Sequence, residues 1–152
     1  MSTAEQVERS WELHSEHVPV VLPSATGTGG VLYTVPGAVE QLIVAISFTY
    51  TASANAATRI PFVQFLDQSG VQVCEAGSPF SLVATNVSRV SFGIGLVQFG
   101  ANSAVRMGCA IPPITLADGM QVKLSATLID AADTITAARL YVRQRAVQEL
   151  VF

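Results

Sequence analysis

The chain has 152 residues, of which 50% are hydrophobic and 12% are charged, and its formal net charge is −3. The charged share is about half of the roughly 25% found in an average globular protein. With so many apolar residues, this excludes a disordered chain and indicates one domain with a sizeable core. Eight Lys and Arg against eleven Asp and Glu give no basic excess for nucleic acid, and no apolar run approaches the roughly 18 residues of a membrane span.

The chain is predicted to divide into an N-terminal arm, residues 1–23, and a β-sandwich domain, residues 24–152. Charged side chains are concentrated at the start of the arm, at Glu5, Glu8, Arg9, Glu12 and Glu16. At its end, residues 18–23 contain two prolines among apolar residues, and proline is tolerated in a strand only at an edge or an end. We therefore expect this stretch to be an extended segment along the edge of a sheet.

A short helix is one interpretation of the first part of the arm. Thr3 and Gln6 have the spacing of a capping box, which would start a helix running from Ala4 to about Trp11. No long apolar stripe supports this helix. We prefer a partly ordered arm that docks through Trp11 and Leu13.

The next segments are a loop and two strands. Residues 24–30 are rich in Gly, Ser and Thr and form a flexible loop, but they lack the Lys-Ser/Thr pair of a phosphate-binding loop. Residues 31–35 are a short strand. Residues 41–51 are the clearest strand, because alternate apolar residues share one face: Leu42, Val44, Ile46, Phe48 and Tyr50.

Turn residues divide the middle of the chain into further short strands. Residues 60–66 and 71–75 are expected to form a hairpin around a turn at residues 67–70. Strands are also predicted over residues 80–84, 90–99 and 104–110. Gly93 and Gly95 share one face of the 90–99 strand, which leaves room for a close neighbour, either an aromatic ring or the backbone of another subunit.

Two alternating runs follow an Asp-Gly turn at residues 118–119. In the first run, residues 120–129, apolar residues occupy every second position: Met120, Val122, Leu124, Ala126 and Leu128. In the second, residues 134–143, Leu140 and Val142 are expected to face inward, with Arg139, Tyr141 and Arg143 outward. We expect the two runs to form an antiparallel hairpin that closes a sandwich. A helix over residues 133–150 is the alternative, because its Ala, Leu, Arg and Gln favour one, but its apolar residues form no stripe of helical spacing.

The predicted fold class is all-β, an antiparallel β-sandwich or jelly roll. It rests on about eight strands separated by turn signals at intervals of roughly 8–15 residues, with no internal repeat. The two cysteines, Cys74 and Cys109, are too few for a disulfide framework. We expect two free thiols in a reducing compartment, with a single Cys74–Cys109 bridge as the alternative.

No catalytic residue, cofactor or metal ligand is predicted. The only histidines, His14 and His17, lie in the arm without a third ligand at matched spacing. Asp118, Asp130 and Asp133 each lie in a turn, where Asp commonly hydrogen-bonds the backbone, so a pair of catalytic carboxylates is disfavoured. A calcium ion bound by Asp130 and Asp133 stays open as an alternative.

Charged residues are sparse between Gln41 and Val122, where Ser, Thr, Gln and Asn supply the polar faces. Because the cores of interfaces are depleted in charge, this pattern indicates an oligomer or a docked subunit. A neutral but soluble β-surface is the alternative. The candidate interaction residues are Trp11 and Leu13 of the arm, the basic cluster Arg139, Arg143 and Arg145, and Phe152 at the apolar C-terminus.

The last part of the chain resembles a known family. It has a proline-containing lead-in at residues 111–113, the Asp-Gly turn, an alternating strand, an Asp-Ala-Ala-Asp turn at residues 130–133 and a final Arg-Leu-Tyr-Val-Arg strand at residues 139–143. This order is similar to the C-terminal part of small β-sandwich virion proteins of tailed bacteriophages. The resemblance implies a structural protein of a virus particle, and it assigns a role to no individual residue.

The function expected from the sequence is therefore non-enzymatic. We expect a capsid decoration, or cement, protein that stabilises a phage head as a trimer, with the major capsid protein or other virion subunits as partners. Its location would be the virion, after synthesis in the host cytoplasm, and neither nucleic acid nor a membrane is expected to bind. The alternatives are a head–tail junction or tail structural protein and, from another class, a carbohydrate- or receptor-binding jelly roll.

Overall fold

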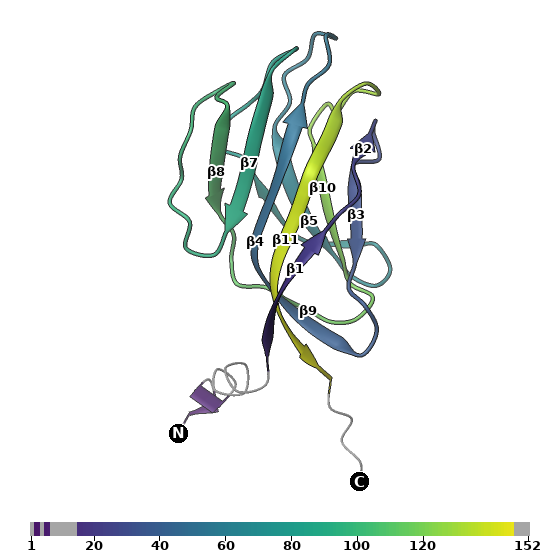
Figure 1. The fold of residues 1–152 in the computed structure, drawn as a ribbon, viewed down its shortest axis with the longest axis vertical. Helices are drawn as coiled ribbons and strands as arrows, with labels where there is room; N and C mark the ends of the chain where they lie inside the picture. Colours follow the sequence, from purple (N-terminus) through teal and green to yellow (C-terminus); the bar gives the residue numbers. More distant parts are fainter. Residues whose placement is uncertain (1, 4, 7–14, 148–152) are drawn as a thin grey trace.

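The computed structural model of the protein describes residues 2–3, 5–6 and 15–147, and most of them form two packed β-sheets (Figure 1). The strands are β1 (Glu16–Val21), β2 (Ala25–Thr26), β3 (Val31–Thr34), β4 (Val39–Thr51), β5 (Pro61–Leu66), β6 (Gln72–Gly77), β7 (Val87–Gly93), β8 (Arg106–Ala110), β9 (Thr115–Leu116), β10 (Gln121–Ala126) and β11 (Thr134–Ala146). The large sheet has the order β1-β11-β4-β7-β8, with β2 beside β11 and β9 beside β4. The small sheet has the order β3-β10-β5-β6.

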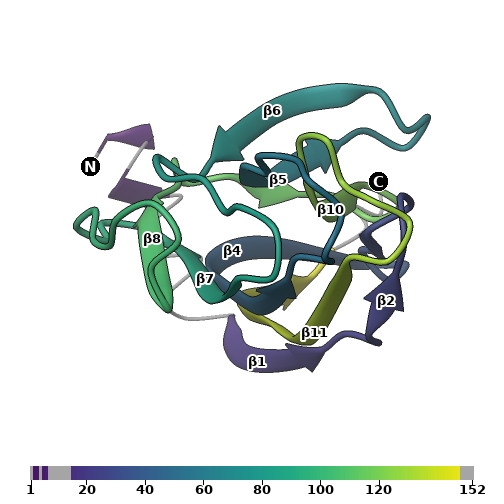
Figure 2. The same ribbon diagram turned by 90° about the horizontal axis from the view of Figure 1, so that it is seen from above.

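Figure 2 shows the two sheets as two layers, with the apolar core between them. Strand alternation supplies this core, since one side chain in two points inward. Phe48, Phe65 and Phe92 are almost fully buried, and the rings of Phe48 and Phe92 stack with centroids 6.3 Å apart. The predicted β-sandwich is confirmed. All strand pairs are antiparallel except β7 with β8.

The expected hairpin between the two last alternating runs is wrong. β10 lies in the small sheet between β3 and β5, whereas β11 lies in the large sheet between β1 and β4. Residues 127–133 connect the two layers, and Leu128, expected in the core, turns out of the strand with φ 52° and is 72% exposed. The alternation in β10 and β11 was interpreted correctly, but each strand pairs with more distant partners than its neighbour in sequence. β11 is a strand over 13 residues, so the helical alternative is also wrong.

β4 contains a bulge that the periodicity did not predict. Tyr141 pairs with Ala45 and the next residue of β11 pairs with Ile43, so that Val44 is the extra residue. On one side of the bulge the expected face is buried, from Ile46 to Tyr50. On the other side the facing is reversed: Ile43 is buried in place of Leu42 and Val44.

The 90–99 strand is shorter than predicted. β7 ends at Gly93, because the chain turns there: the amide of Leu96 donates to the carbonyl of Gly93, and Gly95 has φ 69°. The chain then crosses to β8 and pairs with β7 in parallel. The predicted 80–84 strand is reduced to one bridge between Arg59 and Leu82.

The described parts of the chain ends test two of the predictions for the N-terminal arm. The edge segment at residues 18–23 overlaps β1, which pairs along the edge of the large sheet with β11. A capping box is present one residue earlier than predicted: Ser2 and Glu5 exchange hydrogen bonds of 2.7 Å and 3.2 Å between side chains and amides. Trp11, Leu13 and Phe152 lie outside the described residues.

The cysteines and the possibility of a membrane-spanning helix can also be examined in the described residues. Cys74 and Cys109 are free thiols, as predicted, and both are half-buried. No helix among these residues has the length and apolar character needed to cross a membrane.

Candidate functional site

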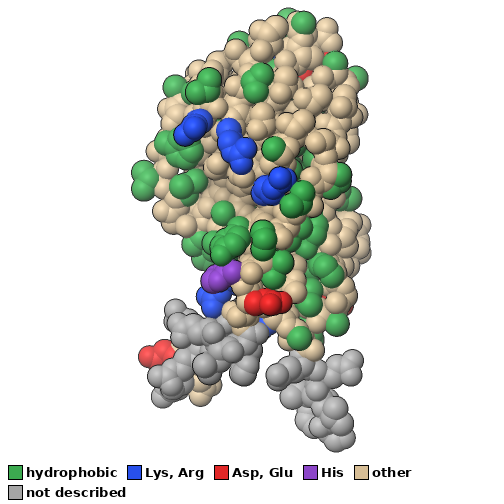
Figure 3. All heavy atoms as spheres, in the orientation of Figure 1, with side chains coloured by type: hydrophobic (Ala, Val, Ile, Leu, Met, Phe, Trp, Pro, Cys, Tyr) green, Lys and Arg blue, Asp and Glu red, His purple; other side chains and the backbone are tan. Residues whose placement is uncertain are grey.

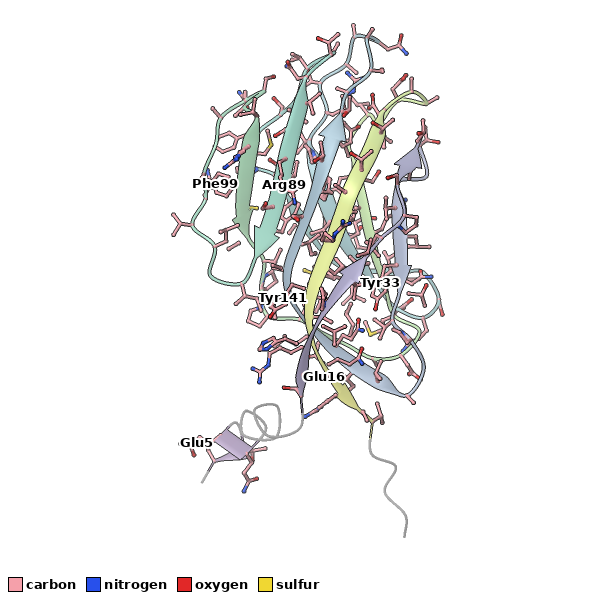
Figure 4. The ribbon with its side chains drawn as sticks, viewed as in Figure 1. Glu5, Glu16, Tyr33, Arg89, Phe99 and Tyr141 are labelled. Carbon is pink, nitrogen blue, oxygen red and sulfur yellow. The ribbon has the colours of Figure 1, made fainter. Side chains whose placement is uncertain are left out.

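The outer face of the large sheet, the side turned away from the small sheet, carries three exposed arginines. Arg139 lies on β11, Arg89 on β7 and Arg106 on β8. Each is followed in its strand by a buried apolar residue, Val90, Met107 or Leu140, and strand alternation turns the guanidinium groups to the same outer face. We call these three residues the arginine row; Figure 4 shows Arg89 on this face, with Tyr141 farther down the same face.

Strand register places two serine side chains, Ser47 and Ser91, beside the arginine row. Arg139 pairs with Ser47 of β4, and Ser47 pairs in turn with Ser91 of β7. Arg89 lies directly beside Arg106 and donates from Nη2 to Ser47 Oγ over 3.2 Å. Like charges at neighbouring strand positions repel, so this arrangement favours binding of an anionic group between them.

None of the row has a carboxylate partner within the described residues. The two ion pairs found there join Arg59 to Asp133 and Arg145 to Glu40. On the face in Figure 3 the upper blue side chains form a diagonal with no red side chain between them. The outer face is thus locally positive in a protein whose formal net charge is −3.

An apolar groove of about 570 Å³ adjoins the arginine row. Its lining includes Pro19 of β1, Tyr141 of β11, and Ile94 and Leu96 from the turn after β7. Val44, the bulge residue of β4, also lines it. Gly93, which has no side chain to fill the groove, and residues 94–96 of the turn after it are part of the lining. In Figure 3 a green apolar area lies below the upper blue side chains.

His17 lies against Tyr141, one of the residues that line this groove. Its ring stacks on Tyr141 with centroids 5.3 Å apart and an angle of 3° between the planes. Tyr141 is 43% exposed, whereas Tyr50 is buried and the hydroxyl of Tyr33 donates to Gln41. Among the described residues, Tyr141 is therefore the one tyrosine that presents its ring on this face.

The predicted basic cluster is divided by the structure. Arg139 belongs to the arginine row, but Arg145 forms an ion pair with Glu40, with Nη2 2.8 Å from Oε2. Arg143 donates to Ser15 Oγ over 3.1 Å near the start of β1. Residues 139, 143 and 145 alternate on one strand face, yet their partners differ because β11 crosses different neighbours along its 13 residues.

Sequence reasoning missed Arg89 and Arg106 as partners of Arg139. The alternation around Arg89 was a usable signal, since Val90 and Phe92 share one face of the strand and both are buried. No comparable signal in the sequence indicated the pairing that brings β7, β8 and β11 into one sheet, because β7 and β8 pair in parallel after a crossover of residues 94–105.

A second charged cluster lies inside the protein, at the other end of the sandwich. Arg59 and Asp133 are fully buried, with Nε 3.0 Å from Oδ2 and Nη2 3.1 Å from Oδ1. The carboxylate also accepts from the Tyr50 hydroxyl at 2.6 Å, the Ser53 amide at 2.7 Å and the Asp130 amide at 3.0 Å. Five donors on two oxygens satisfy the buried charge.

These contacts shift two pKa values in opposite directions. Burial opposes ionisation of Asp133, but the hydrogen bonds from the amides of Asp130 and Ser53, from Tyr50 and from Arg59 outweigh it and hold its pKa well below the usual range. Burial, followed by the hydrogen bond to Asp133 and its charge, raises the pKa of Tyr50. Asp133 is therefore ionised and Tyr50 neutral at ordinary pH.

The buried cluster does not fit the calcium alternative. Calcium needs several carboxylate and carbonyl oxygens free to face it, whereas both oxygens of Asp133 are occupied by hydrogen-bond donors, one of them cationic. Asp130 accepts from Ser53, Asn55 and the Ala132 amide, which lower its pKa in the order Ala132, Asn55, Ser53. Within residues 2–3, 5–6 and 15–147, no three His, Cys, Asp or Glu side chains gather as metal ligands.

Comparisons with known proteins give only distant similarities. No protein-family model matches the chain, and no curated protein is significantly similar to it. Among solved structures, a particle of IBDV described as T13 is 13% identical over 86% of this chain and 31% of its own, with a TM-score of 0.39. The VP2 subviral particle of infectious bursal disease virus is 10% identical over 88% of this chain and 38% of its own, with a TM-score of 0.24.

An enzyme has a TM-score in the same range as the viral proteins. An endo-1,4-beta-D-xylanase of Clostridium thermocellum, complexed with xylohexaose, is 12% identical over 91% of this chain and 25% of its own, with a TM-score of 0.32. The chain thus spans less than two fifths of each of these solved proteins. TM-scores below 0.5 transfer neither a fold nor a function.

Proposed function

We propose that the protein is a structural subunit of a virus particle, and specifically a decoration protein that binds and stabilises a phage head. The observation that carries the proposal is the outer face of the large sheet. There an apolar groove lies directly beside three arginines that have no carboxylate partner among the described residues. A face that combines an apolar area with charged side chains beside it has the composition of a protein–protein interface.

Two features of the sequence support the same proposal. The chain is poor in charge, with 12% charged residues, which suits a subunit that covers part of its surface with neighbours. The order of turns and strands over residues 111–143 resembles small β-sandwich virion proteins of tailed bacteriophages. The strands and the 130–133 turn that carry this resemblance are formed, as β10, β11 and the buried Asp133 cluster.

The mechanism would be binding alone. A subunit that binds an assembled shell, and not its dissociated proteins, stabilises the shell by mass action, and the effect is repeated at every site of a symmetric particle. Burying the groove would supply the apolar contribution, and the arginine row would select acidic partners. A trimer would bring several such contacts to one position on the shell and increase the overall affinity.

The proposal is tested by measuring whether the purified chain binds to virus heads. Purified chain would be mixed with heads of the source virus that lack it, the heads sedimented, and the bound copies counted by quantitative mass spectrometry. We expect saturable binding with a fixed number of copies per head, and a higher temperature of head disruption. Chain that stays in the supernatant at every concentration would overturn the proposal, and chain bound only to separated tails would assign it to the head–tail junction or tail.

Two variants locate the contact. Arg139→Glu should lower the number of bound copies several-fold, whereas Lys123→Glu, a matched charge reversal on β10 of the small sheet, should not. Deleting residues 1–17 tests the arm as a clamp; unchanged binding would remove the arm from the mechanism.

A further inference from the structure

The outer face of the large sheet presents two adjacent strips of different chemistry. One is the arginine row, in which Arg89 and Arg139 lie on strands separated by β4. With strands about 4.8 Å apart and an offset of two residues, their backbones are roughly 12 Å apart. The other strip is the apolar groove, bordered by Tyr141, Ile94 and Leu96. A partner that fits both must carry acidic and apolar side chains in neighbouring rows.

The N-terminal segment of this chain has that composition. Its glutamates at positions 5, 8 and 12 follow the 3- and 4-residue spacing of one helix face, and Ala4, Val7 and Trp11 follow the same spacing beside them. The capping box formed by Ser2 and Glu5 is a helix start at the right position. On a helix Glu8 and Glu12 would be about 6 Å apart along the axis, close to the spacing of about 4.8 Å between the paired strands that carry Arg89 and Arg106.

We propose that the outer face of the large sheet binds the N-terminal segment, residues 2–13, of a second copy of this chain. Glu8 and Glu12 pair with the arginine row, and Trp11 enters the apolar groove. This contact rests on the proposed function in one respect, since it supplies the association between copies that a decoration protein needs. It deepens that function by naming the partner of the face.

The path of the chain favours a second copy over the same molecule. β1 runs along the edge of the sheet, and its first residue, Glu16, comes three positions before Pro19, which lines the groove. In Figure 1 residues 2–3 and 5–6 lie beyond the lower end of β1. The Ser15 hydroxyl accepts from Arg143 at that same end and holds the start of β1 there. The segment of a neighbouring copy can reach the groove without reversing its direction.

The experiment is the mass of the full chain in solution, measured by analytical ultracentrifugation at micromolar concentrations in 50 mM and 500 mM NaCl. We expect association at low salt and a clear loss of it at high salt, because the contact is partly electrostatic. Arg89→Glu/Arg139→Glu, called the face variant, and a chain lacking residues 2–13, called the arm variant, should each be monomeric. Lys123→Glu should associate like the unchanged chain. An unchanged chain that is monomeric at 50 mM salt would overturn the proposal.

A mixing experiment tests the direction of the contact. The face variant keeps its arm and the arm variant keeps its face, so the two together can make one contact and should form a 1:1 pair. Adding Glu8→Arg/Glu12→Arg to the face variant should restore association of that chain with itself. A mixture that stays monomeric, or single variants that associate as the unchanged chain does, would overturn the proposal. Particle binding of the unchanged chain is measured separately by the head-sedimentation assay, so failure of this contact and failure of the proposed function can be told apart.

Discussion

Arginine performs two different tasks in this protein, and the surroundings decide which. At one end of the sandwich Arg59 is fully buried, and its guanidinium group contacts Asp133, Ser53 and the carbonyl of Ala57. On the outer face of the large sheet Arg89, Arg106 and Arg139 are exposed and have no ion pair among the described residues. The first arrangement is complete within the chain, and the second offers charge to another molecule.

The energetic consequence of removing an arginine therefore differs between the two places. A buried ion pair adds little net stability over apolar residues of the same shape, but breaking it leaves an uncompensated charge in the core. An exposed arginine leaves nothing unsatisfied when it is removed. The comparison predicts which substitutions affect the fold and which affect association.

The largest effect is expected for Arg59→Met, which leaves the carboxylate of Asp133 buried without its cation. We expect a loss of about 3–5 kcal/mol in the free energy of unfolding, measured by urea denaturation. Arg89→Met, the matched change on the outer face, should stay within about 0.5 kcal/mol. Equal losses for the two variants would contradict the comparison. If Arg59→Met does not fold, Arg59→Lys, which keeps the charge, should still lower the urea midpoint more than Arg89→Lys.

The second-largest effect is expected from acid, which should lower the stability that the buried Arg59–Asp133 cluster contributes. The pKa of Asp133 is lowered in the folded chain relative to about 3.9 in the unfolded chain, so in acid the unfolded state binds more protons. Its contribution to stability is therefore present above about pH 4 and is lost as the pH falls toward the folded pKa. Urea midpoints between pH 6 and pH 2.5 should decrease on acidification, and the ¹³C signal of the Asp133 carboxyl should titrate below the usual range. A carboxyl that titrates near its ordinary pKa would contradict this assignment.

A smaller effect is expected where the crossover supports the arginine row. A Cβ at Gly108 of β8 would lie 2.6 Å from the ring of Phe99 and 2.6 Å from the carbonyl oxygen of Ser91. Gly108→Ala should therefore cost about 1–3 kcal/mol by overpacking, and it should disturb Arg106, two residues earlier, while leaving Arg59 in place. Gly77→Ala, at a position with open space, is the control and should change stability by less than about 1 kcal/mol. Equal costs at the two glycines would show that Phe99 is not held against β8.

The smallest effect on folding is expected for Arg139→Met, within about 0.5 kcal/mol by urea denaturation. The same change should reduce association between copies several-fold in sedimentation experiments. A variant that loses stability and keeps its association would reverse the roles assigned to the two sets of arginines.

Local periodicity predicted much of this architecture. The alternation of apolar residues identified β4, β5, β10 and β11 and correctly turned Leu140 and Val142 inward. The turn residues at 67–70 were also identified: Asp67 Oδ1 accepts from the amides of Ser69 and Val71. These features depend on residues close in sequence, so a single chain is enough to find them.

Pairing between strands was not predictable in the same way. Alternation states which face of a strand is apolar, but any neighbouring strand with an apolar face satisfies it. This is why β10 and β11 were expected to form a hairpin and in fact lie in opposite sheets. The bulge at Val44 and the parallel pairing of β8 likewise depend on partners far away in the chain.

The sequence by itself determined that this protein is an all-β sandwich with a sparsely charged surface, because period-two alternation and composition are properties of the chain alone. The tertiary structure decided which of its charged side chains lie next to each other. Arg59 meets Asp133 across 74 residues of sequence, and Arg139 joins Arg89 and Arg106 only because β11, β4, β7 and β8 lie side by side. Electrostatic partners are chosen by distance in space, and strand order sets that distance.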